Sequence, residues 1–141
     1  MKRKFISLVT LLATVLLSVF CFAACGGKAA AEVVETTDTV VVIRVNETDG
    51  AATLYDVMED LQEANELQFE LAGTMLKSLN GTANPADFSY CWMLYTSDSE
   101  MGNNEWGTYD YNGTILPSAI LGGDALIVSA GETYVWVYQK F

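Results

Sequence analysis

The sequence predicts an α+β domain in which a mostly antiparallel sheet packs on one amphipathic helix. Three observations predict this class. A β-branched run at 39–45 comes first, a single stretch with helical spacing of apolar residues follows at 53–66, and short strand-like segments fill the remainder. One helix placed early in a chain of strands is typical of a sheet covered on one face.

The first strand and the helix carry the clearest local signals. Segment 39–45 (Thr-Val-Val-Val-Ile-Arg-Val) is rich in residues that favour extended backbone, and an Asp-Gly turn pair follows at 49–50. Thr53 and Asp56 have the spacing of a capping box, which predicts that a helix begins there. The predicted inner face of this helix consists of Leu54, Val57, Met58 and Leu61.

The later strands are separated by turn signals. Asn-Gly pairs at 80–81 and 112–113 supply the positive φ angles of tight hairpin turns. Alternating or aromatic composition predicts further strands at 68–71, 75–79, 90–95, 106–111, 125–128 and 134–138.

The N-terminus has the features of an export signal. Three basic residues at 2–4 precede 20 uncharged residues at 5–24. Phe22-Ala23-Ala24-Cys25 resembles the lipobox of bacterial lipoproteins, in which the cysteine is lipidated and becomes the mature N-terminus. We therefore expect a signal peptide over 1–24, a small and acidic tether over 25–38, and a domain over 39–141 on the outer face of the bacterial cell membrane. An uncleaved anchor helix and ordinary cleavage near 29–31 are the alternatives, and both also place the domain outside the cytoplasm.

Composition excludes several functions. Beyond Lys4 the chain has 18 acidic residues against four basic ones, a net charge of −14, which disfavours nucleic-acid binding. No histidine is present, so His-based triads and His metal ligands are excluded. The acidic loop 97–105 lacks the EF-hand pattern and is interpreted as a solvated loop, with a Ca²⁺ site as the alternative. Cys91, in apolar surroundings, is expected to be buried and unpaired. No catalytic residue and no metal site is predicted.

Three motifs resemble the transcobalamin-like C-terminal domain family. Residues 53–58 (Thr-Leu-Tyr-Asp-Val-Met) resemble its T-L-x-D-x-L helix start, 90–95 (Tyr-Cys-Trp-Met-Leu-Tyr) its Y-W-x-x-Y strand, and 131–136 (Gly-Glu-Thr-Tyr-Val-Trp) its closing hairpin. The resemblance covers about residues 38–140. It implies a β-grasp fold and a binding module whose candidate ligand is cobalamin. Beyond the lipid predicted on Cys25, no covalently bound group is expected.

Aromatic residues concentrate in the C-terminal part of the chain and supply the candidate binding site. Side chains alternate across a strand, so two aromatic-rich strands can place their rings on one face. That face is either an exposed stacking platform or the core beneath the helix, and the sequence leaves both alternatives open. The candidate ligand-binding residues are Tyr90, Trp92, Trp106, Tyr109, Tyr134, Trp136 and Tyr138.

These observations predict a non-catalytic binding module anchored to the membrane through lipid on Cys25. Its predicted ligand is a corrinoid or another small ring-bearing molecule. The alternative is a surface interaction or adhesion protein that recognises a protein or a wall polymer.

Overall fold

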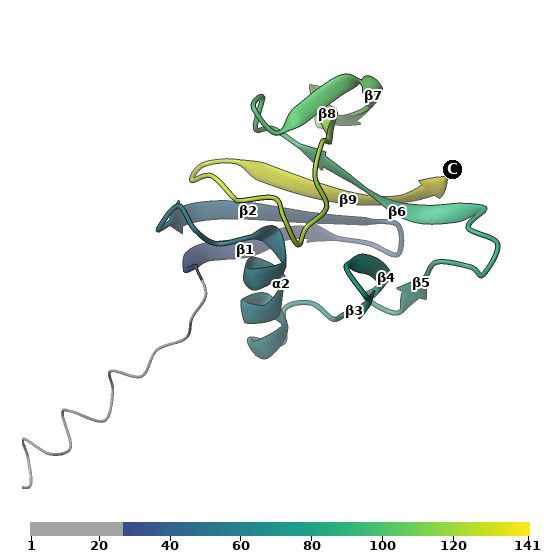
Figure 1. Ribbon diagram of the computed structural model, residues 1–141, viewed down its shortest axis with the longest axis horizontal. Helices are drawn as coiled ribbons and strands as arrows, with labels where there is room; N and C mark the ends of the chain where they lie inside the picture. Colours follow the sequence, from purple (N-terminus) through teal and green to yellow (C-terminus); the bar gives the residue numbers. More distant parts are fainter. Residues whose placement is uncertain (1–26) are drawn as a thin grey trace, which may run out of the picture.

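The computed structural model describes residues 27–141, which form two antiparallel sheets and one helix (Figure 1). The predicted signal peptide 1–24 and Cys25 lie outside the described residues. Within 27–141, no helix has the length and apolar character needed to cross a membrane.

The larger sheet has six strands in the order β1-β2-β9-β6-β8-β7. Every neighbouring pair in it is antiparallel. Figure 1 shows β1, β2 and β9 through the middle of the molecule, with the β7–β8 hairpin at one end. The strands are β1 (Ala29–Thr36), β2 (Val40–Thr48), β6 (Tyr90–Thr96), β7 (Gly102–Tyr111), β8 (Thr114–Ala119) and β9 (Thr133–Lys140).

The smaller sheet and the helix lie between β2 and β6 in the chain. The sheet consists of β3 (Phe69–Ala72), β4 (Met75–Leu79) and β5 (Thr82–Ala83). Helix α2 (Leu54–Glu63) begins where predicted, since Thr53 is its N-cap and forms both hydrogen bonds of a capping box with Asp56. It ends at residue 63, three residues earlier than expected. Both residues of each Asn-Gly turn have positive φ, as predicted.

The predicted α+β, β-grasp-like class is wrong. Nine strands in two sheets dominate the chain between residues 27 and 141, and the single helix has only ten residues. Local patterning identified the helix and most strands. It did not reveal three further strands, β1, β5 and β8, or the separation of β3–β5 into a sheet of their own.

The predicted tether over 25–38 is also wrong, because residues 29–36 form β1. This strand pairs with β2 along its length, and its alternate side chains Ala29, Ala31 and Val33 are half-buried against the main core. Small, acidic composition hid this period-two pattern. The start of the strand is held at Lys28, whose backbone N–H donates to Asp49 Oδ2 at 2.8 Å.

The predicted strand at 125–128 is absent, and only Ile127 forms a bridge, with Thr53. The backbone of this segment pairs with the start of the helix instead. Leu54 N donates to the Leu126 carbonyl and Tyr55 N to the Gly123 carbonyl, both at 2.9 Å. The segment that follows β8 is therefore fixed to the N-terminus of α2.

Alternation along β9 divides the core into two clusters. Tyr134 and Trp136 belong to the larger cluster, whereas Val135 and Val137 belong to the smaller one on the opposite face. The larger cluster also contains the buried side chains of β2 and α2, namely Val41, Ile43, Val45, Leu54, Tyr55, Val57, Met58 and Leu61. Both sheets, the helix and both clusters lie within residues 27–141, so this part of the chain has its own hydrophobic core.

Candidate functional site

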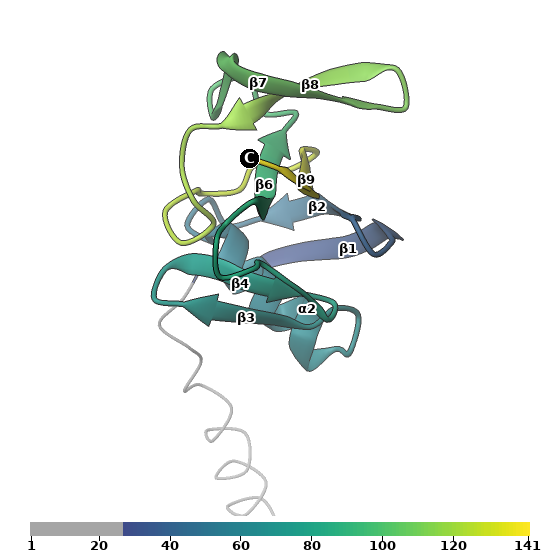
Figure 2. The same ribbon diagram turned by 90° about the vertical axis from the view of Figure 1, so that its right-hand side faces the viewer.

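An apolar groove of about 490 Å³ lies between the two sheets, beside β6. Figure 2 shows β6 between the β7–β8 hairpin and the smaller sheet. Along this side, β6 pairs with β8 only at Tyr95, opposite Ser118. The groove therefore forms where the two strands diverge. Its volume is in the range of pockets that bind drug-sized molecules.

The lining comes from five parts of the chain and contains no charged side chain among the described residues. Aromatic, aliphatic and sulfur-containing side chains predominate. The lining residues are Tyr55 of α2; Thr74, Met75 and Leu76 of the smaller sheet; Asn84, Phe88, Cys91, Trp92, Met93 and Leu94; Ser118, Ala119, Ile120, Leu121 and Gly122; and Trp136 and Phe141 of the C-terminal part.

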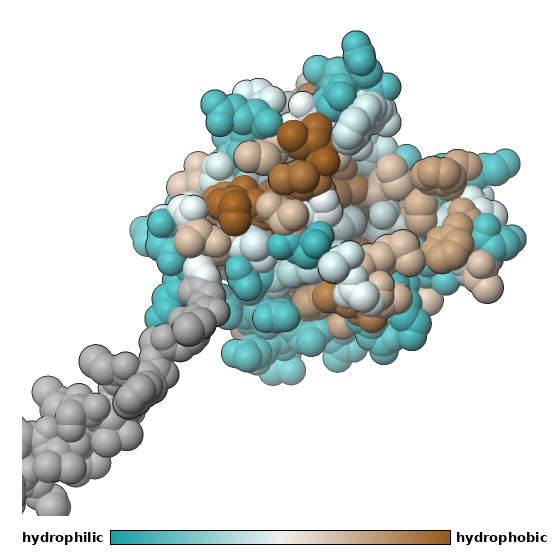
Figure 3. Space-filling model, in the orientation of Figure 1, coloured by the Kyte–Doolittle hydropathy of each residue, from teal (hydrophilic) through white to brown (hydrophobic). Residues whose placement is uncertain are grey.

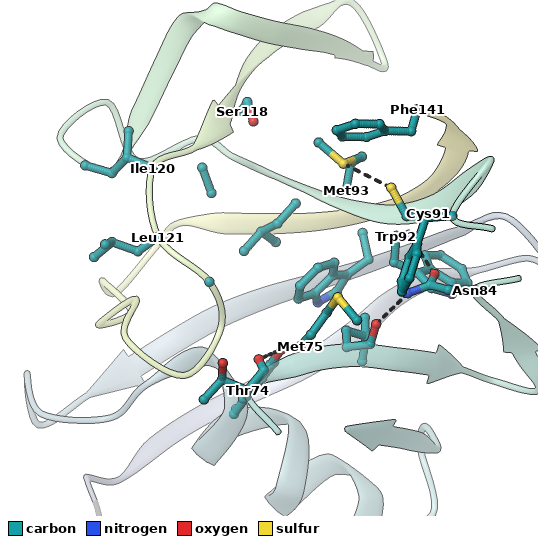
Figure 4. A pocket seen from close by; sticks show the side chains of 17 residues that line it. Thr74, Met75, Asn84, Cys91, Trp92, Met93, Ser118, Ile120, Leu121 and Phe141 are labelled. Atoms are coloured by element: carbon teal, nitrogen blue, oxygen red, sulfur yellow. Dashed lines mark hydrogen bonds between the residues drawn. The ribbon is translucent and has the colours of Figure 1, made fainter. Parts of the chain in front are cut away.

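The rim of the groove exposes large apolar side chains. Figure 4 shows Ile120 and Leu121 on one side, Phe141 and Met93 on another, and Met75 at the centre. All of these residues except Met93 are exposed to solvent, and so is Phe88. The exposed rim residues are Met75, Phe88, Ile120, Leu121 and Phe141. On the face seen in Figure 3, hydrophobic residues gather over the segment between β8 and β9, beside a hollow. Exposed apolar side chains gathered around one groove indicate a binding surface.

Trp92 ties the smaller sheet to the larger one. Its side chain is 6% exposed, and its Nε1 donates to the Thr82 carbonyl at 2.9 Å. Its backbone N–H donates to Asn84 Oδ1 at 3.2 Å, and Asn84 Nδ2 donates to the Leu76 carbonyl at 2.8 Å. The polar atoms of Trp92 and Asn84 in this wall therefore already have partners.

Trp136 differs from Trp92 in one respect. It is 4% exposed and lies in the centre of the sheet, opposite Val41 on β2 and Leu94 on β6. Its Nε1 is buried and has no hydrogen-bond partner among residues 27–141. An unpaired buried donor costs about 1–3 kcal/mol, so native proteins rarely keep one without a reason.

Tyr55 and the segment after β8 form another wall. Tyr55 donates its hydroxyl hydrogen to the Thr74 carbonyl at 3.0 Å. Burial, with a smaller contribution from the negative charge of Asp124, raises the pKa of Tyr55 to about 12. Gly123 is required beside this ring, because a Cβ there would lie 2.3 Å from Tyr55 Cε1. The ring is therefore neutral at physiological pH and fixed in place.

Phe88 stands at the rim in an unusual conformation. Its φ is +52°, which is rare for a bulky side chain, and half of the side chain is exposed. The residues on either side hold the turn, since Ser89 donates from both its N–H and its hydroxyl to Asp87 Oδ1. These two bonds lower the pKa of Asp87.

Cys91 lines the groove and is half-buried, rather than fully buried as predicted. Burial raises the pKa of the Cys91 thiol, which donates to Met93 Sδ at 3.6 Å, so the thiol stays protonated at neutral pH. Among residues 27–141, no three carboxylate, thiol or imidazole groups come together as a metal site requires.

The structure brings the rings of Tyr90, Trp92 and Tyr138 together and separates the other predicted site residues. Trp92 and Trp136 line the groove, whereas Tyr134 is fully buried and its hydroxyl accepts from Ser129 N at 2.8 Å. Tyr90 and Tyr138 stack on each other at 5.6 Å beyond the groove. Trp106 and Tyr109 lie on β7, and neither lines the groove.

The exposed aromatic platform, one of the two alternatives, is therefore not formed. Tyr134, Trp92 and Trp136 belong to the larger cluster with the buried face of α2. These three residues instead form part of the hydrophobic core, which was the other alternative left open by the sequence.

Sequence reasoning missed the apolar residues that complete the groove. Met75 and Leu76 come from β4, Ile120 and Leu121 from the segment after β8, and Phe88 from the loop before β6. One signal was available. Ile120 and Leu121 directly precede Gly122-Gly123, and an apolar pair beside two glycines is unusual for a solvated loop.

No family model, no curated protein and no solved structure matches this chain. The resemblance to the transcobalamin-like C-terminal domain family therefore stays a prediction from three short motifs.

Proposed function

We propose that this chain is a non-catalytic binding module, anchored to the outer face of the cell membrane, that holds an uncharged ring-bearing molecule in the groove beside β6. One observation carries the proposal, namely the apolar character of the groove. Its lining contains two tryptophans and no charged side chain from residues 27–141, and its rim consists of exposed apolar side chains. Such a lining favours flat, apolar ligands, because large aromatic side chains provide stacking area.

Charge narrows the ligand class. The described residues contain all 18 acidic residues and only four basic ones. Their combined field repels anions, and no arginine or lysine lines the groove to offset it. Neutral molecules, or cations whose apolar part enters the groove, are the expected ligands.

Size also favours a small ring system. A cavity of about 490 Å³ lies in the lower half of the range of pockets that bind drug-sized ligands. A corrinoid, predicted from the resemblance, is a substituted macrocycle with an attached nucleotide and is larger than this groove. We therefore include a corrinoid in the test as a comparison and propose a smaller ring-bearing ligand.

The experiment is a fluorescence titration of a soluble form comprising residues 27–141 with 2-acetonaphthone, followed through the tryptophans. Cobalamin and 1-naphthoate serve as the macrocyclic and anionic comparisons. Saturable binding of the neutral ketone, at least tenfold tighter than that of the anion, is expected. Equal binding of both naphthyl probes, or no binding of the ketone, would contradict the proposal.

Two matched variants locate the site. Leu121→Glu places a charge on the groove rim and is expected to weaken ketone binding at least tenfold, whereas Leu71→Glu is the control. The two leucines are similarly exposed, at 41% and 37%, and Leu71 on β3 does not line the groove. Equal loss in both variants would place the probe outside the groove.

The second candidate function, recognition of a protein or wall polymer, is favoured by the β7–β8 hairpin. Trp106 is 62% exposed and Ile115 is 58% exposed on this hairpin. Exposed tryptophans are frequent anchors of interfaces. Co-sedimentation of the soluble form with purified peptidoglycan, lost in Trp106→Ala and retained in Leu121→Glu, would favour this function over the groove.

A further inference from the structure

We infer that the groove ligand carries an uncharged hydrogen-bond acceptor, such as a ketone, amide or ether oxygen, that pairs with the indole N–H of Trp136. The inference deepens the proposed function and rests on it, because it names the polar group that the ring-bearing ligand must have.

The first step is the unpaired donor. Trp136 lines the groove, is almost fully buried, and has an Nε1 without a partner among the described residues. Trp92 lines the same groove but donates from its Nε1 to the Thr82 carbonyl. The fold therefore satisfies one indole and leaves the other without an acceptor. Indole nitrogen only donates, so an acceptor is what the ligand must supply.

The second step is the state of Tyr55 and Asn84, since the remaining polar side chains of the lining, Thr74 and Ser118, carry hydroxyls that can either donate or accept. The Tyr55 hydroxyl donates to the Thr74 carbonyl, and Asn84 uses its Oδ1 for Trp92 N and its Nδ2 for the Leu76 carbonyl. These groups hold the walls together and are not free for a ligand. The cross-strand neighbours of Trp136 are Val41 and Leu94, whose side chains accept no hydrogen bond.

The third step is access. The indole nitrogen is buried, so a ligand atom reaches it only after a neighbouring side chain shifts. Met75 lines the groove at its centre and is 46% exposed (Figure 4). Methionine is flexible and adapts its packing easily. A ligand oxygen that enters beside Met75 would give the unpaired Nε1 of Trp136 its acceptor.

The test compares two probes of the same shape. In 2-acetonaphthone a carbonyl occupies the place of a methylene in 2-ethylnaphthalene, so the pair differs in one acceptor. The affinity ratio of ketone to hydrocarbon is measured for residues 27–141 in the wild-type sequence and in Trp136→Phe. This ratio is expected to fall about fivefold in the variant, which is the size of one buried hydrogen bond. Trp106→Phe, on the hairpin away from the groove, is the control and leaves the ratio unchanged.

The outcomes separate the inference from the function beneath it. A ratio that is the same in wild type and Trp136→Phe, with both probes bound, overturns the acceptor and leaves the groove as a binding site. Failure of both probes to bind wild type overturns both. Should Trp136→Phe not unfold cooperatively, the wild-type indole N–H resonance replaces it. That resonance is expected to move downfield with the ketone and not with the hydrocarbon, and an equal shift with both would contradict the inference.

Discussion

Two buried tryptophans on neighbouring strands differ in whether the indole N–H has a hydrogen-bond acceptor. Trp92 on β6 and Trp136 on β9 are both buried in the larger cluster and both line the groove. Only Trp92 finds an acceptor for its indole N–H, in the Thr82 carbonyl. A buried hydrogen bond contributes about 1 kcal/mol, whereas a buried unpaired donor is unfavourable, so the two residues differ in what they add to stability.

This difference predicts the effect of two identical substitutions. Trp92→Phe removes a hydrogen bond and leaves the Thr82 carbonyl without its donor, whereas Trp136→Phe removes a donor that has no partner. Both lose a similar ring volume. We expect Trp92→Phe to lower the free energy of unfolding by about 1–2 kcal/mol more than Trp136→Phe, measured by urea denaturation. An equal or larger loss for Trp136→Phe would show that its N–H is satisfied.

The raised pKa of Tyr55 predicts a loss of stability at alkaline pH. Burial raises its pKa from the ordinary 10 to about 12, so between these values the folded chain keeps a proton that the unfolded chain releases. The contribution of the neutral Tyr55 side chain to the free energy of unfolding is therefore fully present below pH 10 and is lost as the pH rises toward 12. The expected loss is about 1–3 kcal/mol. Tyr55→Phe should show a smaller loss over this range in thermal melts, and an unchanged loss would contradict the assignment.

Sequence reasoning at this scale identified part of the site. Trp92 and Trp136 were predicted because aromatic residues at alternate positions share a face of a strand. Their position toward the core was left open, because alternation does not say which face the helix covers. The groove walls at Met75 and Leu121 were not predicted, since they come from segments far apart in the chain. The unpaired state of an N–H depends on neighbours that a sequence does not reveal.

At the scale of elements, the helix cap and the turns were predicted correctly from local signals, whereas the strand predicted at 125–128 did not form and the strand pairing was not predicted. The capping box of Thr53 and Asp56 fixed the start of α2, and both Asn-Gly turns formed as expected. Strand β1 was missed because alternation of alanine with exposed residues is a weak hydrophobic pattern. It becomes a strand through its pairing with β2. The α+β prediction failed for the same reason, since the number of strands depends on partners distant in sequence.

The helix supplies a stability prediction at this scale. Leu61 is 4% exposed and packs in the larger cluster with β2 residues. Leu61→Ala is expected to lower the free energy of unfolding by about 2–5 kcal/mol, because the truncation leaves a cavity in the core. The control is Glu59→Ala on the exposed face of α2, expected to change stability by less than about 0.5 kcal/mol. Urea denaturation measures both, and a loss below about 0.5 kcal/mol for Leu61→Ala would show that the helix does not contribute to the core.

For the whole molecule, strand β1 shortens the proposed link to the membrane. Gly27 packs against the loop at 51–52, so closely that a Cβ would lie 2.0 Å from Ala52 N. With lipid on Cys25, only two residue steps, at most about 7 Å, would separate the anchor from the folded domain. The proposal thus places the start of β1 at the membrane surface rather than on a long tether.

Anchoring is tested by Cys25→Ser in the full chain. Loss of the thiol removes the acceptor for lipid, and the variant is expected in the soluble fraction or as an unprocessed precursor of higher mass. Cell fractionation and intact-mass analysis measure both properties. Cys91→Ser, within the domain, is the control and should remain membrane-bound. Unchanged mass and membrane association of Cys25→Ser would contradict lipid anchoring.

Binding in the groove is tested by methionine-methyl NMR of residues 27–141 titrated with 2-acetonaphthone. The four methionines of this segment divide evenly, since Met75 and Met93 line the groove whereas Met58 and Met101 do not. Ring currents of a bound naphthyl group shift methyl signals within a few ångströms. We expect saturable shifts of the Met75 and Met93 methyls with those of Met58 and Met101 nearly unchanged. Shifts confined to Met58 or Met101, or no shift at any of the four, would contradict ligand binding between the two sheets.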